Sequence, residues 1–198
     1  MYEKILRLNT ECARQAVDKA FIAQYANIAP KELVTLWQEV GLGIFCNGVF
    51  RIVSPDDYQD FVDTYIEDKE RYFEYSLPFM TTAFGDVFVW VKDICQNREY
   101  AIFINVRSGN WDIITSRIDL LFSLYMAEEK WLKKFFDLKV TDFSKLTDKL
   151  GIPKADECFG YVPALALGGS KSLKNIQIVK MLPYIEIIAQ TIGTFDMK

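Results

Sequence analysis

The strongest constraint on the fold is a series of apolar runs between residues 78 and 114, in which each run is followed by a turn. In the run 87–91, Val87, Val89 and Val91 alternate with Phe88 and Trp90, so both sides of a strand would be apolar. The neighbouring runs are similar, and turn residues divide them: runs 78–84, 100–106 and 111–114, with turns at Gly85, Gln96–Asn97 and Ser108–Asn110. Strands of this kind predict a sheet that is covered on both faces.

Helical periodicity brackets these strands. Apolar residues at helical spacing predict helices at 11–26 (capped by Thr10), 30–40 (ended by Gly41), from Ser54 onward, 117–136, 141–150 and about 185–192. Between them, Asn47-Gly48 joins two apolar runs, 43–46 and 49–53, and predicts a type I′ hairpin. We therefore expect an α+β fold, with a mainly antiparallel sheet flanked by helices in two interlocked subdomains, 1–110 and 111–198.

The composition excludes several kinds of chemistry. The 198 residues include no histidine, which rules out Ser–His and Cys–His nucleophiles, an imidazole base and a His-ligated metal. The cysteines at 12, 46, 95 and 158 form no CxxC pair, so we interpret them as reduced thiols. A net charge of −4 argues against direct nucleic-acid binding. We expect no catalytic, cofactor-binding or metal-binding residues and no enzymatic activity.

Two further patterns bear on location and nucleotide binding. Charged residues interrupt the N-terminal region, and no apolar run approaches the ~18 residues of a membrane span, so we expect a cytoplasmic protein without membrane contact. The run 167–172 superficially resembles a phosphate loop, but its glycine spacing is wrong, and a turn is the better interpretation. The absence of histidine leaves one enzymatic hypothesis open, a hydrolase that uses Asp, Glu and Lys side chains.

Residues 54–74 form a strongly acidic segment, with a charge balance of −6. Its eight carboxylates stand against only Lys69 and Arg71: Asp56, Asp57, Asp60, Asp63, Glu67, Asp68, Glu70 and Glu74. One interpretation is the solvated face of an amphipathic helix whose apolar face carries Tyr58, Phe61 and Val62. The other is a binding surface for a basic protein, since carboxylates on one face steer such a partner. On the second interpretation the contact residues are Asp56, Asp57, Asp60, Asp63 and Glu67.

Several aromatic residues stand beside polar ones, and some are candidates for interface anchors. They are Tyr72, Phe73, Tyr75, Trp111 and Trp131. Tryptophan and tyrosine are enriched among the residues that dominate binding energy at protein interfaces. Burial in the core is the alternative interpretation for each of them.

Two stretches resemble a known family combination. A Trp-bearing helix, Gly41-Leu-Gly43, a hairpin and the helix start Pro55-Asp-Asp-Tyr58 resemble the GAD-like domain, and Gly85-Asp-Val-Phe-Val-Trp90 fits its central strands. Residues from about 150 to 193, with Tyr161-Val-Pro-Ala-Leu-Ala-Leu-Gly-Gly169, resemble the C-terminal domain that usually follows it. The combination is similar to immunity proteins paired with DNase toxins of the type VI secretion system.

This resemblance implies a cytoplasmic immunity protein that binds and neutralises a cognate toxin, expected to be a basic nuclease domain. The alternative is a non-enzymatic regulatory or ligand-sensing adaptor on the same fold, because a fold does not dictate function. Pro163, Gly168 and Gly169 in the second stretch are interpreted as fold-determining residues and not as a binding site.

Overall fold

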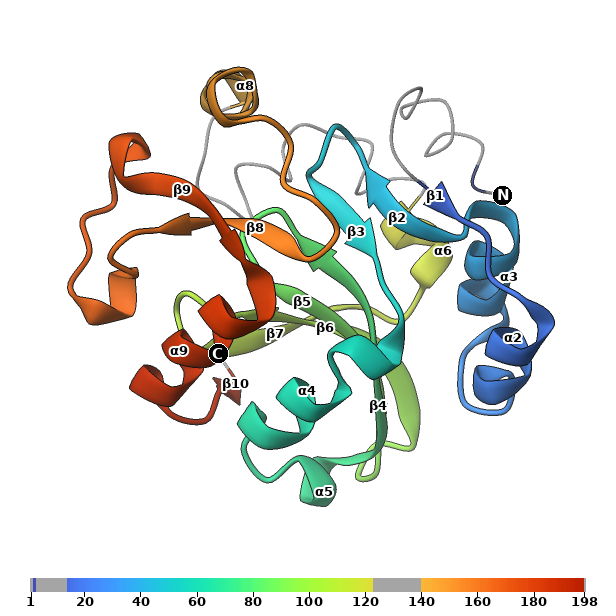
Figure 1. Ribbon diagram of the computed structural model, residues 1–198. Coiled ribbons are helices and arrows are strands. Elements are labelled where there is room, and N and C mark those ends of the chain that lie inside the picture. Colours follow the sequence, from blue (N-terminus) through green and yellow to red (C-terminus); the bar gives the residue numbers. More distant parts are fainter. Residues whose placement is uncertain (1, 3–13, 123–139, 198) are drawn as a thin grey trace.

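The structure is a computed structural model that describes residue 2, residues 14–122 and residues 140–197 (Figure 1). An eight-stranded sheet has the order β1-β2-β3-β4-β5-β6-β7-β10, and β8 and β9 form a second, two-stranded sheet. Neighbouring strands are antiparallel except β10, which runs parallel to β7. The strands are β1 Arg14–Gln15, β2 Leu42–Phe45, β3 Phe50–Ile52, β4 Phe73–Thr82, β5 Val87–Asp93, β6 Arg98–Asn105, β7 Asn110–Thr115, β8 Glu157–Tyr161, β9 Ile176–Lys180 and β10 Asp196–Met197. The predicted α+β class with a mainly antiparallel sheet is confirmed.

The helices lie on both faces of the large sheet. They are α2 Lys19–Tyr25, α3 Lys31–Val40, α4 Gln59–Tyr65, α5 Lys69–Tyr72, α6 Ile118–Leu120, α8 Val140–Leu150 and α9 Met181–Ile192, with short 3-10 turns at Pro55–Asp57, Leu165–Leu167 and Leu173–Asn175. The helices predicted at 30–40, 141–150 and near the C-terminus are present. Most of the helix predicted at 117–136 lies outside the described residues.

The first predicted helix is shorter than expected. Residues 14–15 form strand β1 instead, and α2 begins only at Lys19. Asp18 caps it, because its carboxylate accepts a hydrogen bond from the Phe21 N–H at 2.8 Å. Pairing of β1 with β2 therefore overrides the helical periodicity of residues 14–18. The predicted cap, Thr10, lies outside the described residues.

Two hydrophobic cores confirm that the central strands are buried on both faces. On β5, Phe88 and Trp90 pack into one core with Leu36 and Trp37 of α3. Val87, Val89 and Val91 point the other way, into a second core with residues of α4 and α9. The alternation of valine with aromatic residues in the sequence thus separates the two cores.

The predicted hairpin is present between β2 and β3. Asn47 and Gly48 both have positive φ, 53° and 88°, as a type I′ turn requires. The Val49 N–H donates to the Cys46 carbonyl at 3.1 Å and closes the turn. The turn brings Phe45 opposite Phe50 and so fixes the register of the two strands.

The acidic segment is not one helix. A 3-10 turn at Pro55–Asp57 leads into α4, the chain extends at Ile66, and α5 follows as a separate single turn. Ser54 makes no capping hydrogen bond. The helix breaks because Ile66 pairs with Phe195 near the C-terminus and Asp68 takes a left-handed conformation, with φ of 47°. The predicted apolar face is buried as expected, with Tyr58, Phe61 and Val62 in the second core.

The two halves of the chain are interlocked. Strand β10 joins the sheet built by the N-terminal strands, and the Phe159 N–H of β8 donates to the Ala83 carbonyl at 2.7 Å. Because β7 and β10 belong to the same sheet as β1–β6, the division between residues 110 and 111 stays a prediction.

Candidate partner-binding surfaces

The five predicted contact residues are all exposed, but they do not form one uniform surface. The break between α4 and α5 spreads them over two surface hollows and the helix between. Their positions are Asp56 and Asp57 in the 3-10 turn, Asp60 and Asp63 on α4, and Glu67 in the connection to α5.

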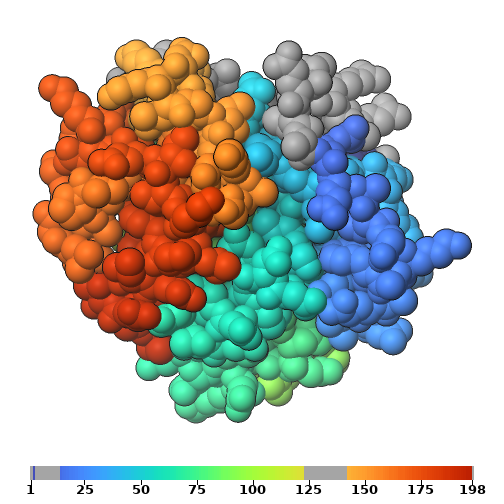
Figure 2. Space-filling view, in the orientation of Figure 1, coloured from blue at the N-terminus to red at the C-terminus, as the bar shows by residue number. Residues whose placement is uncertain are grey.

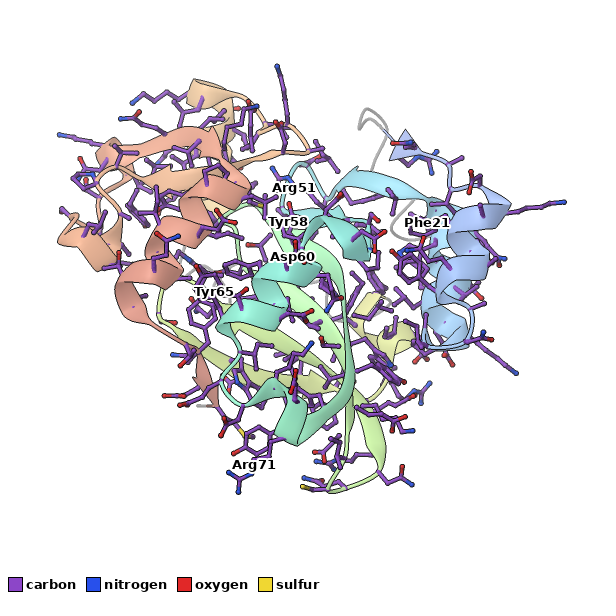
Figure 3. All side chains as sticks on the ribbon, turned by 60° about the horizontal axis from the view of Figure 1, so that its bottom comes forward. Phe21, Arg51, Tyr58, Asp60, Tyr65 and Arg71 are labelled. Carbon is purple, nitrogen blue, oxygen red and sulfur yellow. The ribbon has the colours of Figure 1, made fainter. Side chains whose placement is uncertain are left out.

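Three of the five carboxylates already have partners within the chain: Asp56, Asp63 and, at the second hollow described below, Glu67. Asp56 accepts a hydrogen bond from the Gln24 amide at 3.0 Å. Asp63 forms an ion pair with Lys69 and accepts a hydrogen bond from the Gln59 amide. The Asp60 carboxylate makes no hydrogen bond or ion pair with the described residues and lies exposed on α4 (Figure 3). Asp56 and Asp63 would therefore have to exchange these contacts for those of a partner.

Asp57 lies on a cleft of about 660 Å³ between the N-terminal and C-terminal halves. In Figure 2 the orange-to-red C-terminal residues lie against the cyan-to-green residues of this region. Partial burial and the neighbouring Asp56 carboxylate raise the pKa of Asp57. The polar side chains on the cleft include both signs of charge: Arg14, Arg51, Asp57, Asp156 and Lys180.

The charges at the wall of this cleft are largely engaged by the fold itself. Lys180 donates to Asp156 at 2.5 Å and to Glu157 at 3.3 Å. Arg51 is only 1% exposed and lies beside Tyr58 at the start of α4 (Figure 3). Its guanidinium donates to the carbonyl oxygens of Gly48, Pro153 and Lys154 at 3.0–3.3 Å. Burial lowers the pKa of this group, yet an arginine remains protonated in a protein. Arg51 thus joins the β2–β3 hairpin to the start of the C-terminal half.

Glu67 lies at a second hollow, next to strand β10. The Phe195 N–H donates to the Tyr65 carbonyl at 2.7 Å, and this contact brings Asp196 beside Glu67. A hydrogen bond with Asp196, together with its charge, raises the pKa of the Glu67 carboxyl. Sequence reasoning missed Asp196, because only the pairing of β10 brings it near the acidic segment.

The thiols and carboxylates show no sign of a catalytic or metal centre in the described part of the chain. Cys95 and Cys158 are free thiols there, and Cys12 lies outside it. Burial raises the pKa of Cys158 to about 12, which keeps it protonated and unreactive. Residues 14–122 and 140–197 contain no group of three His, Cys, Asp or Glu residues placed to hold a metal ion. None of the helices within these ranges has the length and apolarity to span a membrane.

The fold is that of an α+β protein whose strands β1 to β7 form an antiparallel meander, with β10 added at the edge beside β7. A solved structure, "Crystal structure of Atu4351 from Agrobacterium tumefaciens", has the same fold, with a TM-score of 0.74 and 20% identity. The match covers all of this chain and 91% of that chain. No curated protein matches.

The chain belongs to the GAD-like domain family, which its residues 1–104 match. Residues 116–191 match a second family, "T6SS immunity protein Tdi1, C-terminal". The resemblance to a GAD-like domain followed by the C-terminal domain of type VI secretion immunity proteins is thus confirmed.

Proposed function

We propose that this chain is an immunity protein of the type VI secretion system that binds and neutralises one cognate toxin. The match of residues 116–191 to the Tdi1 C-terminal family carries this proposal. The protein acts in the cytoplasm as a binding protein and not as an enzyme. It contacts neither nucleic acid nor membrane directly, and the toxin is expected to be a nuclease.

The acidic surface supports a basic partner. Asp56, Asp57, Asp60, Asp63 and Glu67 are all exposed on one segment, and the net charge of the chain is −4. A nuclease binds DNA through cationic side chains, so its active surface is complementary to such a segment. Exposed carboxylates accelerate encounter with a cationic surface and disfavour acidic partners. Occupation of the DNA-binding surface by the immunity protein would exclude the substrate.

The test is co-expression with the toxin domain encoded beside this chain. We expect cells that carry both to survive, cells that carry the toxin alone to die, and the two proteins to co-purify in a fixed ratio. With purified proteins, plasmid cleavage by the toxin should stop at one equivalent of the immunity protein. Survival without a stable complex, or a complex that leaves the toxin active, would contradict neutralisation by direct binding.

A regulatory or ligand-sensing adaptor is the second candidate, and the cleft of about 660 Å³ between the two halves favours it. Small-molecule sites are commonly concave and lie between structural units. Native mass spectrometry of the chain purified from its host would reveal a bound small molecule. A stoichiometric ligand together with no protection from the toxin would favour the adaptor.

A further inference from the structure

The second hollow is a pocket of about 330 Å³ at the end of the large sheet. Three stretches that are distant in sequence contribute to it: 67–73 at α5 and the start of β4, 93–113 from the end of β5 into β7, and 195–197 at β10. Because these stretches include strands of one hydrogen-bonded sheet, the pocket walls are held before any partner arrives. A preorganised pocket loses less freedom on binding than a mobile surface.

The floor of the pocket is aromatic. The ring centroid of Phe73 lies 5.7 Å from that of Trp111 and 6.5 Å from that of Tyr100. All three rings are buried from solvent except where they line the pocket. Such faces carry negative potential and attract a cation placed over them.

Carboxylates are the only charged side chains that line the pocket among the described residues: Glu67, Asp93 and Asp196. Asp93 is held ionised: the Gln96 N–H and the Tyr100 hydroxyl both donate to it at 2.8 Å, and they outweigh its burial and lower its pKa. Glu67 and Asp196 are like charges at hydrogen-bonding range. A cation between them would relieve their repulsion.

The rim of the pocket exposes large apolar side chains. Tyr72, Ile113 and Met197 are 43%, 36% and 59% exposed, and all three line the pocket. Among the described residues, none of the exposed large hydrophobic side chains lines the larger cleft. Interface anchors lie in pockets whose surrounding contacts exclude water, and an apolar rim can supply such contacts when a partner binds.

We propose that this pocket receives an arginine side chain of the toxin and is the anchor point of the complex. The inference rests on the proposed function and adds the residue class that is recognised. The guanidinium would lie over Trp111 and donate to the carboxylates of Glu67 and Asp196, while the rim side chains cover its aliphatic stem.

Arginine fits the pocket better than lysine. A guanidinium is planar, stacks on aromatic rings and donates to two carboxylates at once, whereas an ammonium is a compact and strongly hydrated charge. The chain itself shows the stacking geometry at the edge of the pocket. Arg98 lies 5.3 Å from the Tyr100 centroid and Arg71 lies 5.9 Å from that of Tyr72, yet neither lines the pocket. When Arg98 is counted together with Glu67, Asp93 and Asp196, the net charge of this group remains negative.

The first test measures affinity for the toxin domain with the double variant E67Q/D196N. This variant keeps the shape of both side chains and removes two charges. We expect its Kd to rise by about 10- to 100-fold, because hydrogen bonds to a charged group are lost. The matched control D148N/E186Q removes two charges from exposed carboxylates of α8 and α9 and should bind within about twofold of the wild type.

The outcomes separate the pocket from the proposed function. If the wild type binds the toxin and E67Q/D196N binds equally well, the pocket proposal is overturned and the immunity function stands. In the toxin, Arg→Lys at the anchor should weaken binding nearly as much as Arg→Ala. If E67Q/D196N instead changes the mass of the toxin-free protein in light scattering, a second copy of this chain occupies the pocket, and the proposal is again overturned.

A second test needs no toxin. Arginine amide added to the wild-type protein should shift the Trp111 indole resonance in NMR spectra, and citrulline amide, a neutral analogue of similar shape, should not. The shift should vanish in E67Q/D196N. Equal shifts with both amides, or none with either, would overturn the proposal. If the wild type fails to bind or neutralise the toxin, the immunity function is wrong, and this measurement decides the pocket alone.

Discussion

The two surface hollows of this protein differ in how their charges are used. On the cleft between the halves, Arg51 and Lys180 each donate to acceptors within the chain, and no exposed large hydrophobic side chain of residues 14–122 or 140–197 lines the wall. The pocket at β10 has carboxylates without a cation on its lining and an apolar rim. We call the larger hollow the seam, because its Arg51 and Lys180 form hydrogen bonds within the chain. The smaller hollow has three carboxylates and no cationic side chain on its described lining. Size alone is a poor guide to a protein-binding site.

The contrast predicts opposite consequences of substitution. Changes at Arg51 or Lys180, which bond within the chain, should alter the free energy of unfolding and leave toxin affinity intact. Changes in the pocket should alter affinity and leave stability nearly unchanged. A site evolved for binding commonly retains groups that do not stabilise the fold.

The largest effect is expected for Arg51→Met. Three carbonyl acceptors would lose a charged donor, and the free energy of unfolding should fall by about 3 kcal/mol or more. Urea denaturation monitored by circular dichroism measures this change. Arg51→Lys keeps the charge but not the fork of donors, so its free energy of unfolding should lie between those of the wild type and Arg51→Met. The seam interpretation fails if Arg51→Met unfolds at the wild-type urea midpoint, or if the folded variant loses toxin affinity.

The next effect concerns the rim of the pocket. Tyr72→Ala should raise the Kd for the toxin by about tenfold, since an exposed aromatic side chain would be removed from the contact. Ile28→Ala is the matched control, because Ile28 is also an exposed large hydrophobic residue but lies away from the pocket. Isothermal titration calorimetry compares the two variants. If Tyr72→Ala binds the toxin as tightly as Ile28→Ala does, the toxin does not contact the rim of the pocket.

A smaller effect is expected for Asp60→Lys on α4, which lies between the two hollows. Reversal of one exposed charge should lower the association rate constant roughly threefold at low salt and leave the dissociation rate unchanged. The difference should disappear at high salt, where screening is strong. Stopped-flow measurements over a salt series test this. Glu186→Lys on α9 gives the control, and an identical slowing there would show that only net charge matters.

The smallest effect is a pH dependence at Glu67. Asp196 raises the folded-state pKa of Glu67. The folded state therefore binds this proton more tightly than the unfolded state, and the resulting stability is present below the unfolded pKa of about 4.3 and lost as pH rises through the folded pKa. Glu67→Gln should thus have a slightly higher Tm than the wild type at pH 7, and the gap should close on acidification. A Tm difference that is constant from pH 3 to 7 would contradict the carboxylate pair.

The sheet was well predicted from sequence because its signals are local. The alternation of Val87, Val89 and Val91 with aromatic residues marks a strand buried on both faces, and Asn47-Gly48 marks a turn. The acidic segment was predicted as one helix because its apolar period continues through Ile66. Pairing of Ile66 with Phe195 breaks it, and no local pattern announces a contact across that distance.

The candidate pocket could be predicted only in part. Tyr72, Phe73 and Trp111 were singled out as aromatic residues beside polar ones, and all three line the pocket. Tyr75 is half-buried instead and hydrogen-bonds Glu99, and Trp131 lies outside the described residues. Asp93 and Asp196 carry no signal of their own. They line the pocket with Glu67 from separate strands, Asp93 at the end of β5 and Asp196 on β10.

The parallel pairing of β10 with β7 has a consequence for the order of folding. Strands β1 to β7 follow one another along the chain as they do across the sheet, so they can assemble from mostly local contacts as synthesis proceeds. Asp196 pairs with the sheet across some 80 residues of intervening chain, and this pairing costs the entropy of closing that loop. The proposed anchor is therefore completed only after β1 to β7 have been made, when β10 joins the sheet. A nascent chain that holds β1 to β7 but not yet β10 would lack the proposed anchor.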